Sequence, residues 1–347
     1  MNINTKPIAA VIGLMLFMVA ITRLPVELGK GRDFLVGLFQ IGVLAVFFIV
    51  LWNINKWVGL FLILAVVSRT VPTITLESQH ALKMVLFGLG WYYFVYHYAN
   101  EKLLMDVICV IAFAHFMATT IQYFKIPSLF SGAVCGLTFN PNEGSAMFAL
   151  CFPAFLQEGR KRYLPIIPAG LLMIGSFGGV LAVAVGTLFY VCMLRYYWYA
   201  IIPVVLAVLF WVFIKNGDYK NRIDAWINFL NIYKENWKWG FGLGHWEVVS
   251  IALNKADKIT GWTRTHNSFI NGLVEMGIGF GILVIIYIAD LFRRYIKKAL
   301  IPFTALVVIL ICCSTNSMFR MNAANGIIAI TWLAILEIKL RGDYEKL

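Results

Sequence analysis

Apolar runs recur from one end of this 347-residue chain to the other, and no long polar block separates them. Hydrophobic residues make up 61% of the sequence and charged residues 13%, whereas an average soluble domain has about 25% charged residues. An α-helix satisfies its own backbone hydrogen bonds and can therefore cross lipid. The pattern predicts an all-α, polytopic integral membrane protein that forms a single domain over residues 1–347.

A helix needs about 20 apolar residues to span a bilayer, and we expect about 12 (10 to 12) transmembrane helices because some runs are short. The predicted spans are residues 7–22, 34–52, 57–68, 81–99, 103–121, 144–157, 164–176, 178–194, 198–214, 267–291, 299–318 and 323–338. The first run is not followed by small residues at a cleavage site. We therefore expect it to be retained as the first span.

Basic residues cluster in short segments between the runs, and such segments face the cytoplasm. The clusters are Arg160-Lys161-Arg162, Arg195, Arg293-Arg294 with Lys297-Lys298, and Lys339 with Arg341. All of them fall on one side of the twelve-span arrangement, which predicts cytoplasmic termini. A large outer loop, residues 215–266, then lies outside, together with residues 122–143 and Ser176. Orientation and anionic lipids account for the net charge of +12, so we expect no nucleic-acid partner.

The outer loop ends in a polar sequence, residues 263–269 (TRTHNSF), directly before an apolar run. A lone histidine near a helix start is commonly structural, so two roles stand open for His266: bonding to a loop carbonyl, or general base. Arg264 would favour the neutral imidazole that a base requires. Arg264 and Arg222, at the start of the loop, both suit forked contacts with phosphate oxygens.

Residues 222–239 of the loop predict an amphipathic helix at the lipid interface. Its apolar face would comprise Ile223, Trp226, Leu230, Tyr233 and Trp237. The following sequence, residues 240–244 (GFGLG), predicts a tight turn, with a phosphate cradle as the alternative.

A second polar segment, residues 136–143 (GLTFNPNE), predicts a turn before a helix. Asn140 and Asn142 can cap that helix or bind sugar hydroxyls, and both roles can coexist. Asn267 has the same two possibilities at the helix that follows the outer loop. All three asparagines are candidate substrate-binding residues.

These segments, in this order, resemble the bacterial O-antigen ligase and O-antigen polymerase superfamily of membrane glycosyltransferases. The matching pieces are residues 136–142, Arg222 with Trp226, residues 240–244, and residues 266–269 followed by 275–279 (EMGIG). The resemblance implies a many-helix membrane fold whose outer loop closes over the site. It also implies glycan donors linked by pyrophosphate to undecaprenol.

One feature of the family is missing. Members often carry an arginine two spans before the large loop, where this chain has the sequence SFGG at residues 176–179. Arg69, Arg264 and Arg320 are candidates to replace that arginine.

The expected reaction is an inverting glycosyl transfer at the outer face of the bacterial inner membrane. His266 would accept the proton of the acceptor hydroxyl, and Arg222, Arg264 and Arg69 would stabilise the departing pyrophosphate. Because the acids of the outer loop are scattered, we expect neither metal nor soluble cofactor. The expected partners are the lipid-linked oligosaccharide donor, a glycan or lipid A core acceptor, and the bilayer.

Three alternatives remain open. We favour a repeat-unit polymerase because the chain has no added periplasmic domain, but a ligase that transfers to lipid A core or to protein fits the same motifs. A transporter or flippase would need ionisable residues at mid-membrane, where His115 and Glu275 are candidates and Asp106 and Asp290 lie near span ends. A structural assembly protein would tolerate loss of His266.

Overall fold

The computed structural model describes residues 88–97, 100–124, 134–138, 140–194, 218–242, 267–295, 299–315 and 323–344, and the isolated residues 56 and 60. All regular secondary structure in these ranges is helical, which confirms the all-α prediction. The predicted spans 7–22, 34–52, 57–68 and 198–214 lie wholly or almost wholly outside the described residues. The same is true of His266, Arg264, Arg69 and Arg320.

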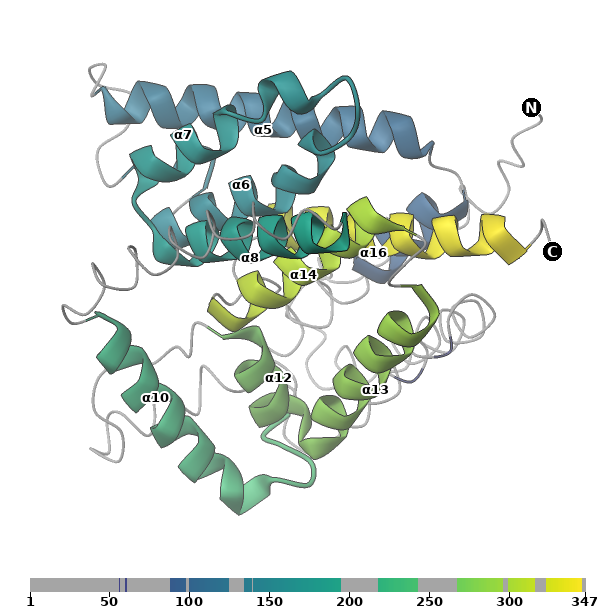
Figure 1. Ribbon diagram of the computed structural model, residues 1–347. Coiled ribbons are helices and arrows are strands. Elements are labelled where there is room, and N and C mark those ends of the chain that lie inside the picture. The colour runs from purple at the N-terminus through teal and green to yellow at the C-terminus, as the bar shows by residue number, and fades with distance from the viewer. Residues whose placement is uncertain are drawn as a thin grey trace, which may run out of the picture.

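Six of the described helices form the main bundle (Figure 1). They are α5 (Glu101–Tyr123), α6 (Pro141–Phe155), α7 (Ile166–Ile174), α8 (Phe177–Met193), α14 (Leu300–Thr315) and α16 (Ala323–Tyr344), and a short 3₁₀ helix, η2 (Lys161–Tyr163), precedes α7. The first five begin and end within about three residues of predicted spans, whereas α16 continues past residue 338 to Tyr344.

Helix α6 lies at the centre of this bundle. Every residue from Glu143 to Phe155 is buried, because α5, α7, α8, α14 and α16 all pack against it. A helix that is apolar on all sides requires such a position. Close approach depends on glycine: a Cβ added at Gly179 of α8 would lie 2.4 Å from the carbonyl oxygen of Ser145.

A second group of helices lies between α8 and α14 in the chain: α10 (Asp218–Tyr233), a 3₁₀ turn η4 (Lys234–Asn236), α12 (Ser268–Met276) and α13 (Ile278–Tyr295). The prediction of one continuous span over residues 267–291 is wrong, because Gly277 separates α12 from α13. Its φ of 73° and ψ of −172° are open to glycine alone. A Cβ there would also lie 2.3 Å from the carbonyl oxygen of Lys238.

The predicted amphipathic helix is present as α10 and η4, and a second apolar side of it packs against α12. Ala225, Phe229 and Tyr233 are buried and pack with Val274 of α12. Of the face that we predicted, only Tyr233 belongs to this contact, and Ile223, Leu230 and Trp237 are exposed. The helix is therefore apolar on two sides: one side packs against α12, and the side predicted to face lipid is largely exposed. Its place at the lipid interface stays a prediction.

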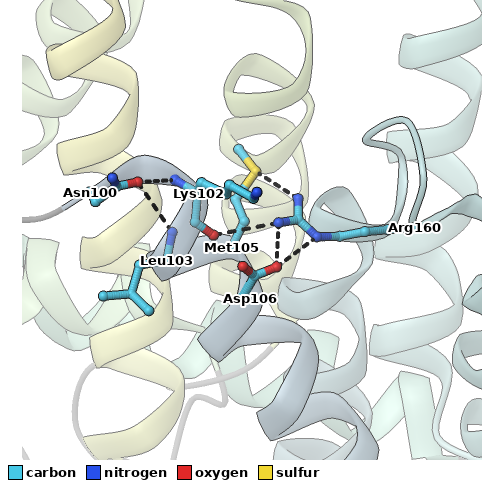
Figure 2. Close-up of polar contacts among 6 residues, drawn as sticks. All are labelled: Asn100, Lys102, Leu103, Met105, Asp106 and Arg160. Atoms are coloured by element: carbon cyan, nitrogen blue, oxygen red, sulfur yellow. Dashed lines mark hydrogen bonds and ion pairs between the residues drawn. The ribbon is translucent and has the colours of Figure 1, made fainter.

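The two ends of the bundle differ in chemistry. At one end, which we call the basic end, the Arg160 guanidinium binds the Asp106 carboxylate and the Lys102 carbonyl oxygen of α5 (Figure 2). Lys339 of α16 pairs with Glu101 of α5 at 2.8 Å. Two of the basic clusters that we predicted to share a side of the membrane therefore lie at the same end of the bundle.

Within the described residues, α5 alone is both long and apolar enough to cross a membrane, with 23 residues and a mean hydropathy of 1.9. The helices α8 and α14 are apolar but shorter. The count of about 12 spans stays a prediction.

Candidate functional site

Buried polar side chains gather at the opposite end of the bundle, where α6, α8 and α16 begin and α5 and α14 finish. We call this region the polar end. Its buried polar residues are Thr119, Thr138, Glu143, Ser145, Ser176, Thr315 and Asn325. Buried polar groups are stable when hydrogen-bonded, and four of these side chains donate to carbonyl oxygens close to them in the chain: Thr119, Thr138, Ser145 and Thr315.

Asn140 and Asn142 organise the start of α6. The Asn140 side-chain oxygen accepts a hydrogen bond from the Glu143 N–H at 3.0 Å, so Asn140 is the N-cap, as predicted. The Asn142 side-chain oxygen accepts a bond of 2.7 Å from the Ser176 hydroxyl. Ser176 occupies the N-cap position of α8 but does not cap it with its side chain. Its hydroxyl instead joins the starts of α6 and α8.

Asn325 joins α16 to the same place. Its amide nitrogen donates to the Glu143 carbonyl oxygen at 3.0 Å, and the side chain is 1% exposed. Seven residues later, the Trp332 indole donates to the Leu150 carbonyl oxygen at 2.8 Å. Contacts that advance by two turns in both helices mean that α6 and α16 run parallel, so both begin at the polar end.

Residues 134–138 form a loop before α6 that is held by α5. The Gln122 side-chain oxygen accepts from the N–H groups of Cys135 and Gly136, both at 2.8 Å, and its amide nitrogen donates to the Gly136 carbonyl oxygen at 2.9 Å. Burial, and secondarily the negative charge of Glu143, raises the pKa of the Cys135 thiol. The thiol donates to the Thr138 carbonyl oxygen at 3.0 Å.

His115 of α5 binds both this loop and α6. Its Nδ1 accepts from the Leu137 N–H at 3.0 Å, so Nε2 carries the hydrogen and donates to the Gly144 carbonyl oxygen at 2.9 Å. Our sequence reasoning considered His115 only as a possible transport residue. In the structure, both ring nitrogens are bonded to backbone groups.

Among the arginines predicted to bind pyrophosphate, Arg222 is the one that lies within the described residues. It is half-buried on α10, and its Nη1 donates to the Thr315 carbonyl oxygen at 2.9 Å. Thr315 is the last residue of α14, so the beginning of α10 contacts the polar end.

Asn267 begins α12 beside the same region. Its side-chain oxygen accepts from the N–H groups of Phe269 and Ile270 at 2.9 and 3.1 Å, so the predicted cap is confirmed. Phe269 packs against the bundle core, and α12 packs against α14. His266 immediately precedes this N-cap in the sequence. The proposed substrate contacts of Asn140, Asn142 and Asn267 stay predictions.

The glycine-rich sequence forms the predicted turn, at least over residues 240–242. Gly240 and Gly242 have φ of 71° and 95°. The N–H groups of Phe241 and Gly242 donate to the carbonyl oxygens of Val274 and Glu275 at 2.8 and 2.9 Å. Because α12 occupies these two N–H groups, the phosphate-cradle alternative is wrong for them.

Sequence reasoning missed Gln122, Ser176 and Asn325 as residues that organise the polar end. Ser176 and Asn325 stand next to apolar runs, where an N-cap is the ordinary role of either residue type. Gln122 follows the apolar run of α5, and its spacing to residues 135–136 carries no sequence signal.

The sequence matches no protein-family model, and it matches none of the curated proteins. The resemblance to membrane glycosyltransferases therefore depends on the ordered motifs in the chain itself.

Proposed function

We propose that this chain is a membrane glycosyltransferase that acts on glycan linked to undecaprenyl pyrophosphate at the outer face of the bacterial inner membrane. The supporting observation is the convergence of separate motifs. Asn140 and Asn142 begin α6, Asn267 begins α12, and Arg222 binds the end of α14. These residues come from three distant parts of the chain and are joined through the helix ends that form the polar end.

The exposed surface of the bundle supports contact with lipid. Along α5, the exposed apolar residues Leu103, Val107 and Val110 recur at helical spacing, with exposed fractions of 62%, 47% and 65%. Ile278, Ile282 and Ile285 form a similar stripe on α13. Such extended apolar surfaces are unusual in soluble proteins and fit the acyl chains of a bilayer. The arrangement of about 12 spans with cytoplasmic termini belongs to this proposal.

Positive charge at the polar end suits a reaction whose leaving group is undecaprenyl pyrophosphate. The guanidinium of Arg222 is oriented by the hydrogen bond that it donates to the Thr315 carbonyl oxygen. In the proposed reaction, Arg222, Arg264 and Arg69 stabilise the negative charge that develops on the leaving group. His266 accepts the proton of the attacking hydroxyl, and the anomeric carbon is inverted without a metal ion.

A repeat-unit polymerase is the preferred form of this function, and a ligase for lipid A core or protein differs from it only in the acceptor. A transporter or flippase is favoured less. Of its candidate residues, His115 bonds to backbone groups through both ring nitrogens, and Asp106 pairs with Arg160 at the basic end.

The test uses full-length protein in lipid nanodiscs with an undecaprenyl-pyrophosphate-linked repeat unit and a chelator. A polymerase yields longer lipid-linked glycans, whereas a ligase yields product only when lipid A core or acceptor protein is added. His266→Ala should abolish transfer, and His97→Ala, at an exposed histidine with no proposed role in the site, is the matched control. Movement of glycan across a vesicle membrane without a new glycosidic bond would refute the enzyme and support the transporter.

A further inference from the structure

The backbone N–H groups of residues 135–137 donate to side chains instead of to other backbone groups. The N–H groups of Cys135 and Gly136 donate to Gln122, and the N–H group of Leu137 donates to His115. Both side chains belong to the second half of α5. The shape of this loop is therefore fixed by a helix outside it.

The same histidine fixes the first turn of α6. Its Nε2 bonds to the Gly144 carbonyl oxygen, and its ring lies 4.4 Å from the ring of Phe148. Gly136 allows the loop to lie this close to the histidine, because a Cβ at this position would lie 2.3 Å from the histidine ring. Its φ of 66° also favours glycine. One imidazole thus sets the loop and the helix start relative to each other.

We propose that His115 and Gln122 are positioning residues that hold Asn140 and Asn142 in place for glycan binding. The role in glycan binding rests on the proposed function, whereas the claim that the two side chains hold the loop does not. Because the two asparagines are assigned to substrate binding, loosening the loop should raise KM for the lipid-linked glycan and change kcat by less than about twofold.

Four substitutions separate the contacts. Gln122→Leu removes all three bonds to the loop, and Gln122→Glu keeps the oxygen that accepts from two N–H groups. His115→Asn places an oxygen near Nδ1 and retains the loop contact, whereas His115→Gln reaches the Nε2 position and retains only the α6 contact. Thr120→Val is the matched control, because the Thr120 hydroxyl donates to Phe116 within α5 and makes no bond to the loop.

Amide hydrogen exchange in full-length protein, followed by mass spectrometry of the peptide that covers residues 134–140, measures how firmly the two side chains hold the loop. Gln122→Leu should accelerate exchange of residues 135 and 136 by about tenfold or more, because it removes three bonds to the loop. His115→Gln should accelerate exchange of residue 137 by about fivefold, because it removes one bond. Gln122→Glu, His115→Asn and Thr120→Val should exchange nearly as the native protein does. Unchanged exchange in Gln122→Leu would overturn the proposal, and unchanged exchange of residue 137 in His115→Gln would overturn it if Gln122→Leu does not fold.

Kinetics with the lipid-linked glycan measure whether the loop positions the two asparagines for glycan binding. We expect KM to rise by about tenfold in Gln122→Leu and to return near the native value in Gln122→Glu. Faster loop exchange with an unchanged KM would overturn the positioning role while leaving the glycosyltransferase intact. If the native protein transfers no glycan but Gln122→Leu still accelerates exchange, the proposed function fails. The conclusion that side chains of α5 hold the loop then still stands.

Discussion

Arg222 donates a hydrogen bond of 2.9 Å to the carbonyl oxygen of Thr315, the last residue of α14. The carbonyl groups at a helix C-terminus carry partial negative charge, so a cation at this position stabilises the helix end. The contact also attaches the outer-loop helix α10 to the bundle. Arg222 thus has a structural role that must be separated from its proposed contact with pyrophosphate.

Arg222→Lys separates the two roles. A lysine can keep the charge and one hydrogen bond to Thr315, so the free energy of unfolding should fall by less than about 1 kcal/mol. Forked contact with two phosphate oxygens is lost, and transfer should slow by about tenfold to a hundredfold. Glycan transfer and thermal unfolding, measured on the same nanodisc preparation, check both effects. Undiminished transfer by a folded Arg222→Lys protein would exclude the forked contact.

The asparagine caps permit a second separation of structure from chemistry. Asn267→Ala should lower the free energy of unfolding by about 1 kcal/mol, because two N–H groups of α12 lose their acceptor. Asn267→Asp should restore stability, since a carboxylate caps as well and suits the positive end of the helix. Thermal unfolding of the three proteins measures this effect. A stability loss shared by the alanine and aspartate variants would contradict the capping role.

Helix identity and approximate bounds were predictable because long apolar runs bounded by polar residues are typical of helices. The N-caps Asn140 and Asn267 were predictable because the signal is local. The break at Gly277 was not, since it depends on the passage of Lys238, almost forty residues earlier, over the same backbone. Likewise, no local rule connects Gln122 with Cys135 or Asn325 with Glu143, because these contacts exist only after the helices pack.

Glycines with positive φ should differ sharply in their tolerance of alanine. Gly277→Ala should lower the free energy of unfolding by about 3 kcal/mol or more, because backbone strain adds to a collision with Lys238. Gly175 is the matched control: it has a φ of 70° in the left-handed region and open space around its Cα. Gly175→Ala should cost about 1 kcal/mol. Equal thermal shifts for the two variants would contradict the tight crossing at Gly277.

Labelling of introduced cysteines tests the assignment of the two bundle ends to opposite membrane faces. Leu137 is exposed near the polar end, and Glu158 is exposed near the basic end. In sealed right-side-out vesicles, an impermeant maleimide should modify Leu137→Cys and should reach Glu158→Cys only after permeabilisation. Peptide mapping by mass spectrometry distinguishes these positions from the native cysteines. Labelling of both positions before permeabilisation would contradict the orientation.

The central position of α6 limits how this protein can move. Ser176 and Asn325 fasten the beginning of α6 to two neighbouring helices, and the glycine contact at Ser145 leaves no space for a lengthwise shift. Packed interfaces of this kind switch between discrete arrangements and do not deform continuously. A piston-like stroke of α6 would break several buried hydrogen bonds at once. The polar end can therefore change shape through the helices around α6, and not through movement of α6 along its own axis.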